Sequence, residues 1–387
     1  GVGASANALV VTSDVTAAID GASDITADYN IAVAANHTTD IDAIGGAVGV
    51  GGTGAGGAAV NVVVIEKTTG AYIGGSSAVT ANAAVGSANM IVADGGLTGT
   101  NDTYDDGDRA STVTIKGAAI TATSTEDVFV LGAAGAASGF IGAAGAVGVI
   151  VVDSDTSAYL GNSARLTSGG SAVISATNKL DLFSGNGGVS LALAGGAAGA
   201  VSVVVVRSDT SAYTTSGTVL TTTGSGAVIV GAAEIMDIDV VAVSGAATAG
   251  IGLAASVSVV SLGNDLTSEQ SGELSGGGGD SLSLADDASS TGWTDSVLGG
   301  FSSTGDADGV DGTGTPSAAS RLASATDGAK DTVNSKAGTS SATGGLSTPP
   351  VTTKGTDASS AGTVNAGGNV DVRANERIDL GTIAGAV

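Results

Sequence analysis

Stretches in which small or β-branched residues alternate with polar residues recur along the chain. Examples are IAVAAN (31–36), AAITAT (118–123), SAVISATN (171–178) and VDVRAN (370–375). Alternation with a period of two is typical of β-strands that bury one face. Each stretch is linked to a Gly/Ala run that ends in valines: GAGGAAVNVVVI (54–65), GAAGAVGVIVV (142–152), GGAAGAVSVVVV (195–206) and ATAGIGLAASVSVV (247–260). The pattern therefore predicts an all-β protein.

Two short motifs show that these stretches belong to a repeat. The first is EKTTGAYI (66–73), DSDTSAYL (153–160) and RSDTSAYT (207–214), with a weaker copy TSDVTAAI (12–19). The second is an acidic residue before an aliphatic one, as in Asp127-Val128 and Asp181-Leu182. The interval from Tyr159 to Tyr213 is 54, and the interval from Val128 to Leu182 is the same. A fixed period of this length indicates stacked repeats.

The period predicts a parallel β-helix, or β-solenoid, of ~54-residue repeats with two insertions. We expect each repeat to divide into three coils of about 18 residues, so that about fifteen coils at ~4.8 Å would form a rod of roughly 70 Å. The expected organisation is as follows: 1–85 solenoid, 86–112 acidic loop insertion, 113–267 solenoid, 268–362 Ser/Gly/Asp-rich insertion, and 363–387 solenoid continuing into a next unit.

The spacing between motif copies locates the two insertions. The interval from Tyr72 to Tyr159 is 87, which is 54 plus 33, and the interval from Ile238 to Leu380 is 142, which is 54 plus 88. The larger insertion contains the only tryptophan. We expect its apolar residues 293–301 to dock on the solenoid or on a neighbouring molecule, and we expect one short helix within 317–337.

Composition and charge restrict the classes of partner. The chain has 65 glycines, 3% aromatic residues and a net charge of −25, with acids that are almost all Asp. Such a field disfavours nucleic acid and anionic membranes and favours cations or basic protein surfaces. The absence of cysteine excludes disulfides and thiolate chemistry. The uncharged runs 128–152 and 182–206 are long enough to span a bilayer, but they are rich in Gly and β-branched residues and acids flank them, so we expect no membrane span.

Two acidic clusters are the candidate metal sites. In each cluster, carboxylates recur close together around glycine, as in the first half of a calcium loop, and the alternative is a solvated acidic turn. The predicted ligands for Ca²⁺ are Asp102, Asp105, Asp106 and Asp108 in the first insertion, and Asp306, Asp308 and Asp311 in the second. No organic cofactor is expected, since the match of GVGGTG (49–54) to a dinucleotide fingerprint is what chance gives in so glycine-rich a chain.

Three further sets of residues have a structural and a functional interpretation. The repeated aspartates could form a carboxylate ladder, but we favour turn residues that bond their own backbone; they are Asp40, Asp127, Asp181, Asp237 and Asp379. The repeated tyrosines could stack on sugars, but we favour a structural ladder; they are Tyr72, Tyr159 and Tyr213. The sole histidine, His37, is expected to be a surface residue or one with satisfied hydrogen bonds.

The two ends of the sequence complement each other. ERIDLGTIAGAV (376–387) stops where a Gly/Ala-to-Val run should continue, and GVGASANALVV (1–11) starts inside such a run. Joined end to start, they nearly complete one more repeat. Isolated solenoids need polar caps, so this predicts that units stack head to tail or continue in a longer tandem protein.

The Gly/Ala-to-Val runs, the S-D-T-S-A-Y elements and strands such as V-D-V-R-A resemble the repeat regions of very large bacterial surface proteins. These are the filamentous-haemagglutinin-like and leukotoxin-type filamentous adhesins. The resemblance covers 1–85, 113–267 and 363–387. It implies a right-handed parallel β-helix, a secreted or surface-bound location and a scaffolding or adhesive role, and it carries over no catalytic residue.

Together these observations predict a non-enzymatic structural subunit of an extracellular fibre or surface appendage. Its expected partners are other copies of itself and cell-surface or matrix components. The first alternative is a stalk segment of a giant covalent adhesin. The second is a polysaccharide-active β-helix enzyme, which the scattered Lys and Arg residues disfavour, because such enzymes need basic residues beside clustered carboxylates in a groove.

Overall fold

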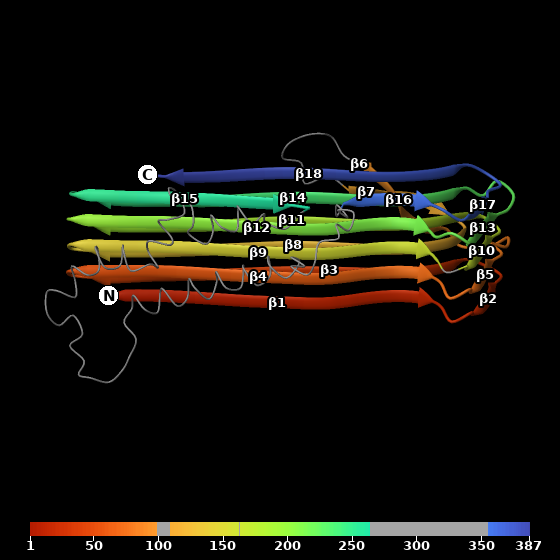
Figure 1. Ribbon diagram of the computed structural model, residues 1–387, viewed down its shortest axis with the longest axis horizontal. Helices are drawn as coiled ribbons and strands as arrows, with labels where there is room; N and C mark the ends of the chain where they lie inside the picture. Colours follow the sequence, from red (N-terminus) through yellow and green to blue (C-terminus); the bar gives the residue numbers. More distant parts are fainter. Residues whose placement is uncertain (99–108, 162, 264–354) are drawn as a thin grey trace, which may run out of the picture.

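The computed structural model describes residues 1–98, 109–161, 163–263 and 355–387. Over these residues the protein is an all-β solenoid built from stacked parallel strands (Figure 1). The strand stacks form three parallel sheets, which we call sheets A, B and C. Sheets A and C consist of long strands and face each other, and sheet B consists of short strands at one end of the slab.

Each sheet receives one rung from every coil. Sheet A contains β1 (Val2–Ile19), β4 (Gly54–Ile73), β9 (Ile141–Leu160), β12 (Gly195–Thr214) and β15 (Ile251–Leu262), with β16 (Thr356–Ser360) beside β12. Sheet B contains β2 (Asp24–Ala27), β5 (Ala78–Ala81), β10 (Arg165–Ser168), β13 (Val219–Thr222) and β17 (Thr363–Asn365). Sheet C contains β3 (Ile31–Gly51), β8 (Gly117–Ser138), β11 (Ser171–Ala192), β14 (Val228–Thr248) and β18 (Val370–Ala386).

The register shows that one whole repeat is one coil, so the prediction of three coils in each repeat is wrong. Val2 pairs with Gly56, and Gly142 pairs with Gly196, in each case one full period later on the adjacent rung. The described chain therefore makes five coils, each running from sheet A through sheet B to sheet C. Strands of about 20 residues are about 65 Å long, whereas five rungs rise only about 20 Å. The solenoid is a broad slab and not a slender rod.

The core lies between sheets A and C and is built from aliphatic columns. Alternate residues point inward, and the same position on successive rungs carries similar side chains. One column on sheet A holds Val63, Ile150 and Val204, each 0% exposed. Columns of this kind need no aromatic residues, because each side chain packs mainly on the rungs above and below it. That accounts for the low aromatic content.

The Gly/Ala runs let the two long sheets approach closely in the half of the slab far from sheet B. A Cβ added to Gly57 would lie 2.1 Å from the carbonyl oxygen of Gly135 on the facing sheet. One added to Gly188 would lie 2.4 Å from the carbonyl oxygen of Gly199. No side chain fits at these positions, so glycine is required by the spacing of the sheets.

The first insertion contains an antiparallel hairpin of β6 (Met90–Thr98) and β7 (Arg109–Ile115). It contacts β8, β11, β14 and β18, so it lies across four rungs on the outer face of sheet C (Figure 1). Its apolar residues pack on that face in a cluster that includes Val92, Val113, Val173 and Ile229. The hairpin, which lies between β5 and β8 within the second coil, therefore braces that coil and the coils after it.

Polar contacts fasten the same hairpin to the last rung. Asp94 Oδ2 lies 3.2 Å from an Arg373 guanidinium nitrogen, and Asn375 Nδ2 donates to the Gly95 carbonyl at 2.6 Å. The Gly96 amide donates to Asp94 Oδ1 at 3.0 Å, and the Ser111 hydroxyl donates to the same oxygen. Asp94 therefore links the hairpin to the last rung and also holds the hairpin's own turn.

The second insertion interrupts a single rung of sheet A. β15 ends at Leu262 opposite Val206, and β16 begins at Thr356 opposite Thr210 of the same strand β12. The two pieces are the halves of one rung. The solenoid therefore resumes at Thr356, earlier than the expected boundary at 362.

Candidate functional site

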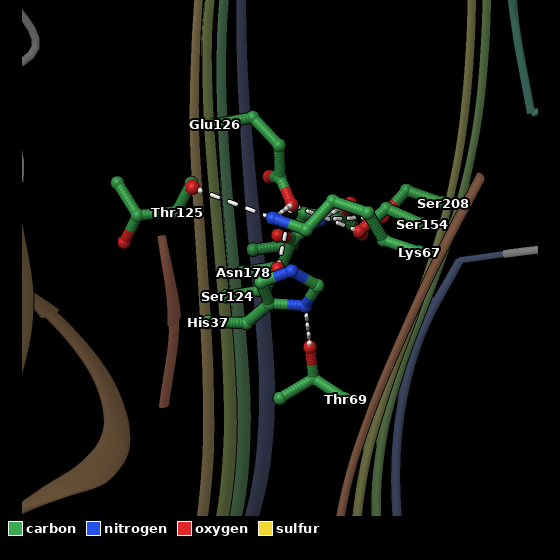
Figure 2. Close-up of polar contacts among 10 residues, drawn as sticks. His37, Lys67, Thr69, Ser124, Thr125, Glu126, Ser154, Asn178 and Ser208 are labelled. Carbon is green, nitrogen blue, oxygen red and sulfur yellow. Dashed lines mark hydrogen bonds and ion pairs between the residues drawn. The ribbon is translucent and has the colours of Figure 1, made fainter. Parts of the chain in front are cut away.

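A buried polar cluster lies between sheets A and C, next to the aliphatic core (Figure 2). Sheet C contributes one inward row across successive rungs: His37, Ser124, Asn178 and Glu234. Sheet A contributes a facing row: Lys67, Ser154 and Ser208. All seven residues are buried. In-register stacking of successive rungs places equivalent polar residues side by side.

The centre of this cluster is an ion pair between the sheets. Lys67 Nζ lies 2.7 Å from Glu126 Oε1, and both side chains are 0% exposed. The hydroxyls of Ser124 and Ser154 donate to the same carboxylate oxygen at 2.5 and 3.2 Å. These donors offset part of the desolvation of the carboxylate, while Glu126 Oε2 has no hydrogen-bond partner.

His37 extends the cluster toward the first coil. Its Nδ1 lies 3.2 Å from the Thr69 hydroxyl, and the residue is 8% exposed. Burial lowers the pKa of His37, and Lys67 lowers it further, whereas Glu126 and Asp14 raise it. His37 is therefore a satisfied interior residue that favours the neutral form.

Glu234 continues the row toward the last coil. Thr356 donates to its Oε2 at 3.0 Å, and Asn178 Nδ2 lies 3.5 Å from its Oε1. Burial raises the pKa of Glu234, the nearby Glu376 raises it further, and hydrogen bonds from Ser208, Thr356 and Asn178 oppose the rise. The interior row thus begins with His37 on the first coil and ends with Glu234 and Glu376 on the last two coils.

The charged atoms of Lys67 and Glu126 lie between the two sheets and are shielded from solvent. Two hollows on the described surface lie elsewhere and are lined by small and aliphatic residues, with Val48 and Ala134 in one and Leu191 and Leu193 in the other. Neither hollow contains a charged side chain.

The repeated aspartates form a ladder on the outer face of sheet C, so their interpretation as turn residues is wrong. Each lies inside a long strand and pairs in register with the next, in the order Asp40, Asp127, Asp181, Asp237 and Asp379. Burial raises the pKa of Asp237, and its neighbours Asp181, Asp239 and Asp379 raise it further against an opposing effect of Lys179. The ladder is thus a line of mutually repelling carboxylates.

The repeated tyrosines form the predicted structural ladder. Tyr72 and Tyr159 stack with ring centroids 4.9 Å apart, and Tyr159 and Tyr213 stack at 5.0 Å. A shorter stack on sheet C joins Phe129 and Phe183 at 5.1 Å. Offset stacking at these distances stabilises the strand register.

The predicted calcium ligands all lie outside the described residues. These are Asp102, Asp105, Asp106 and Asp108 in the first insertion and Asp306, Asp308 and Asp311 in the second. The expected docking segment 293–301 and the expected helix in 317–337 also lie outside them. Within the described ranges, no group of three or more His, Cys, Asp or Glu side chains is arranged to hold a metal ion. No helix in those ranges is long and apolar enough to cross a bilayer.

The outermost rungs expose side chains that are buried in every inner coil. Leu380 and Ile378 on β18 are each 44% exposed, whereas their partners Ile238 and Met236 on β14 are 0% and 5% exposed. At the other end, Leu9 on β1 is 36% exposed and its partner Val63 is 0% exposed. The interior of the slab is therefore open at both ends of the described stack.

Sequence reasoning did not find the Lys67–Glu126 pair or the open row that ends in Glu376. Lys67 and Glu126 are 59 positions apart, and nothing in either local motif links them. A signal exists only once a whole repeat is assigned to one coil, because that assignment places both residues on inward faces of opposing sheets.

Comparison of the chain with protein-family models, with curated proteins and with solved structures finds no match. The resemblance to filamentous adhesin repeats therefore remains a prediction based on the style of the motifs. The open ends and the buried polar row are the features from which a function can be proposed.

Proposed function

We propose that this protein is a non-enzymatic structural subunit of an extracellular fibre or surface appendage. In this proposal, five-coil slabs stack end to end through their open rungs. Each added slab continues the three sheets of the one before it, so the strands lie across the fibre and the hydrogen bonds run along it.

The observation that carries the proposal is the exposure of interior side chains on the outermost rungs. Val370, Val372, Ile378 and Leu380 are between 44% and 53% exposed, although they face the core. Their backbone groups on the open side of β18 have no partner strand among the described residues. A following rung would bury the apolar surface and satisfy the backbone groups together.

The same geometry supports a second candidate, a stalk segment of one giant tandem polypeptide. The next rung would then come from the same chain and not from another copy. Both candidates predict a stiff, regular shaft and differ only in whether the units are covalently joined. The extracellular location rests on the resemblance to filamentous adhesins.

Electron microscopy of the native preparation, together with a denaturing gel of the same sample, tests the proposal. Fibres with an axial repeat of about 24 Å, which is five rungs of ~4.8 Å, are expected. If they dissolve to a band near 36.0 kDa, separate chains stack. If they remain one very large species, the covalent stalk is correct. Isolated short slabs at all concentrations would overturn both.

A further inference from the structure

Resting on the proposed end-to-end assembly, we infer that the junction is formed with one register, in which β18 pairs with β3 of a second copy and Glu376 lies beside His37 of that copy. This surface is the open edge of sheet C. Its partner is a second copy of this chain.

The register follows from how sheet C is built. Neighbouring strands pair without a shift, so one row runs His37, Ser124, Asn178, Glu234, Glu376 through the five rungs. A second copy that continues this sheet without a shift places its own His37 on the next rung, beside Glu376. Val370 then pairs with Ile31 of the second copy.

Apolar rows of the junction match in the same register. On the inner face, Val372 meets Val33 and Leu380 meets Ile41 of the second copy. On the outer face, Ile383 meets Ile44, and these residues are 59% and 65% exposed in the free slab. Apolar residues thus meet apolar residues on both faces, and Asn375 meets Asn36 in the same rung. Cross-strand pairs of this kind stabilise a sheet.

The pairing of Glu376 with His37 selects this register over its neighbours, because His37 favours the neutral form in the free slab but the adjacent Glu376 carboxylate would favour its charged form. The open end at β18 presents Glu376, with the buried Glu234 on the rung beneath it. The opposite end presents His37, with Lys67 and Glu126 packed beside it and Asp14 nearby. A slip of two residues would place Glu376 against Ala35 or Thr39 and leave a carboxylate in the interior without a basic partner. Unpaired buried charge is strongly unfavourable, so the slipped junctions are excluded.

Replacement of Glu376 tests the contact with His37. Glu376 is exposed in the free slab and lies near the buried Glu234, so Glu376→Gln removes a repulsion and should leave monomer melting unchanged or slightly higher. The critical concentration for fibre assembly should rise about tenfold, because a hydrogen bond to a charged group is lost. The matched control is Asp379→Asn, which removes one negative charge from the same strand on its outer face. It relieves repulsion with Asp40 of the next copy and should lower the critical concentration.

Paired cysteines test the register, since the chain has no cysteine of its own. In-register neighbours on adjacent strands have Cα atoms about 4.8 Å apart, which is within the Cα–Cα range of a disulfide. Oxidised fibres of the double variant Ile383→Cys, Ile44→Cys should therefore give a ladder of covalent multimers. The control Ile383→Cys, Val48→Cys uses a similarly exposed position four residues further along β3 and should remain monomeric on the gel.

The outcomes separate this inference from the proposed function. Wild-type protein that never forms fibres contradicts the proposed function itself. Fibres that tolerate Glu376→Gln without change, or that cross-link through Val48 and not through Ile44, leave the assembly standing and overturn the register inferred for it.

Discussion

Lys67 and Glu126 join the two long sheets through a contact of 2.7 Å that is completely shielded from solvent. Buried pairs of this type add little net stability over an apolar pair, but the loss of one partner is costly. The pair therefore fixes how sheet A sits on sheet C more than it strengthens the fold.

Glu126→Gln should destabilise the slab by about 3–5 kcal/mol, because it leaves the Lys67 ammonium buried without a counter-charge. The double variant Lys67→Met, Glu126→Gln should recover most of that loss. Urea unfolding of the two variants and the wild type measures both effects. Arg207→Ala provides the comparison, since its pair with Asp153 at 3.2 Å is partly exposed and should contribute less than about 1 kcal/mol. An equal loss in the free energy of unfolding for Glu126→Gln and Arg207→Ala would contradict this account.

Gly57→Ala should destabilise the protein by about 1–3 kcal/mol or more, because its Cβ would lie 2.1 Å from the Gly135 carbonyl oxygen. Gly145→Ala is the control, as a Cβ at Gly145 meets nothing within 4 Å. Thermal unfolding should show a lower Tm for the first variant and an unchanged or slightly higher Tm for the second. If both behave alike, close contact between the sheets is not the reason for the Gly/Ala runs.

The raised pKa of Glu234 predicts a loss of stability with increasing pH. Because the folded state holds the proton more tightly than the unfolded state, the contribution is fully present below the ordinary pKa of 4.5. It is lost as the pH rises through the higher pKa of the folded state. His37 acts in the opposite direction, since its lowered pKa favours folding as the pH rises toward 6.5. The difference between wild type and Glu234→Gln therefore isolates the carboxyl group.

Urea midpoints measured from pH 4 to pH 8 should fall with pH more steeply for the wild type than for Glu234→Gln. Parallel curves would show that Glu234 does not titrate differently in the folded and unfolded states.

Asp94→Ala should loosen the last rung by about 1–3 kcal/mol, because Asp94 accepts hydrogen bonds from Gly96 and Ser111 and pairs with Arg373. Hydrogen exchange should accelerate in β18 before it accelerates in β11. Asp371→Ala is the matched control, since Asp371 also lies 3.2 Å from Arg373 but is about half exposed. If the two substitutions accelerate hydrogen exchange in β18 equally, the contact of Asp94 with Arg373 does not stabilise the last rung more than an exposed ion pair does.

Calcium binding by the acidic clusters predicts a higher Tm in excess calcium than in chelator, by mass action on the folded state. Replacement of Asp102, Asp105, Asp106 and Asp108 by Asn should remove the part of the shift that comes from the first cluster. The same change at Asp306, Asp308 and Asp311 should remove the rest. An identical Tm in calcium and chelator for the wild type would show that neither cluster is a structural calcium site.

The sequence revealed the rungs but not the size of the coil. The spacing between Tyr159 and Tyr213 is the strand register itself, and the tyrosines stack as expected. The division into three coils failed because alternation shows which residues point inward but does not show where a strand ends. A Gly/Ala run inside a long strand looks the same as the boundary between two short ones.

The interpretation of the aspartates failed for a related reason. Asp is common in turns, so five copies of Asp before an aliphatic residue suggested five turns. In the structure Asp181 faces outward from the middle of β11 while Leu180 and Leu182 face the core. The alternation of buried and exposed positions located these aspartates correctly in strands, whereas the preference of Asp for turns did not. The buried ion pair could not be predicted without the coil size, because its two residues meet only when sheet A folds over sheet C.

The breadth of each coil has a mechanical consequence. β9, β10 and β11 contribute 20, 4 and 22 residues to a single rung, so the hydrogen bonds between adjacent rungs are far more numerous than in the short coil that the sequence suggested. Tension along the stacking direction is shared by all of these bonds at once, and the hairpin β6–β7 ties several rungs together. A shaft of such slabs would part between subunits before any one of them unravelled.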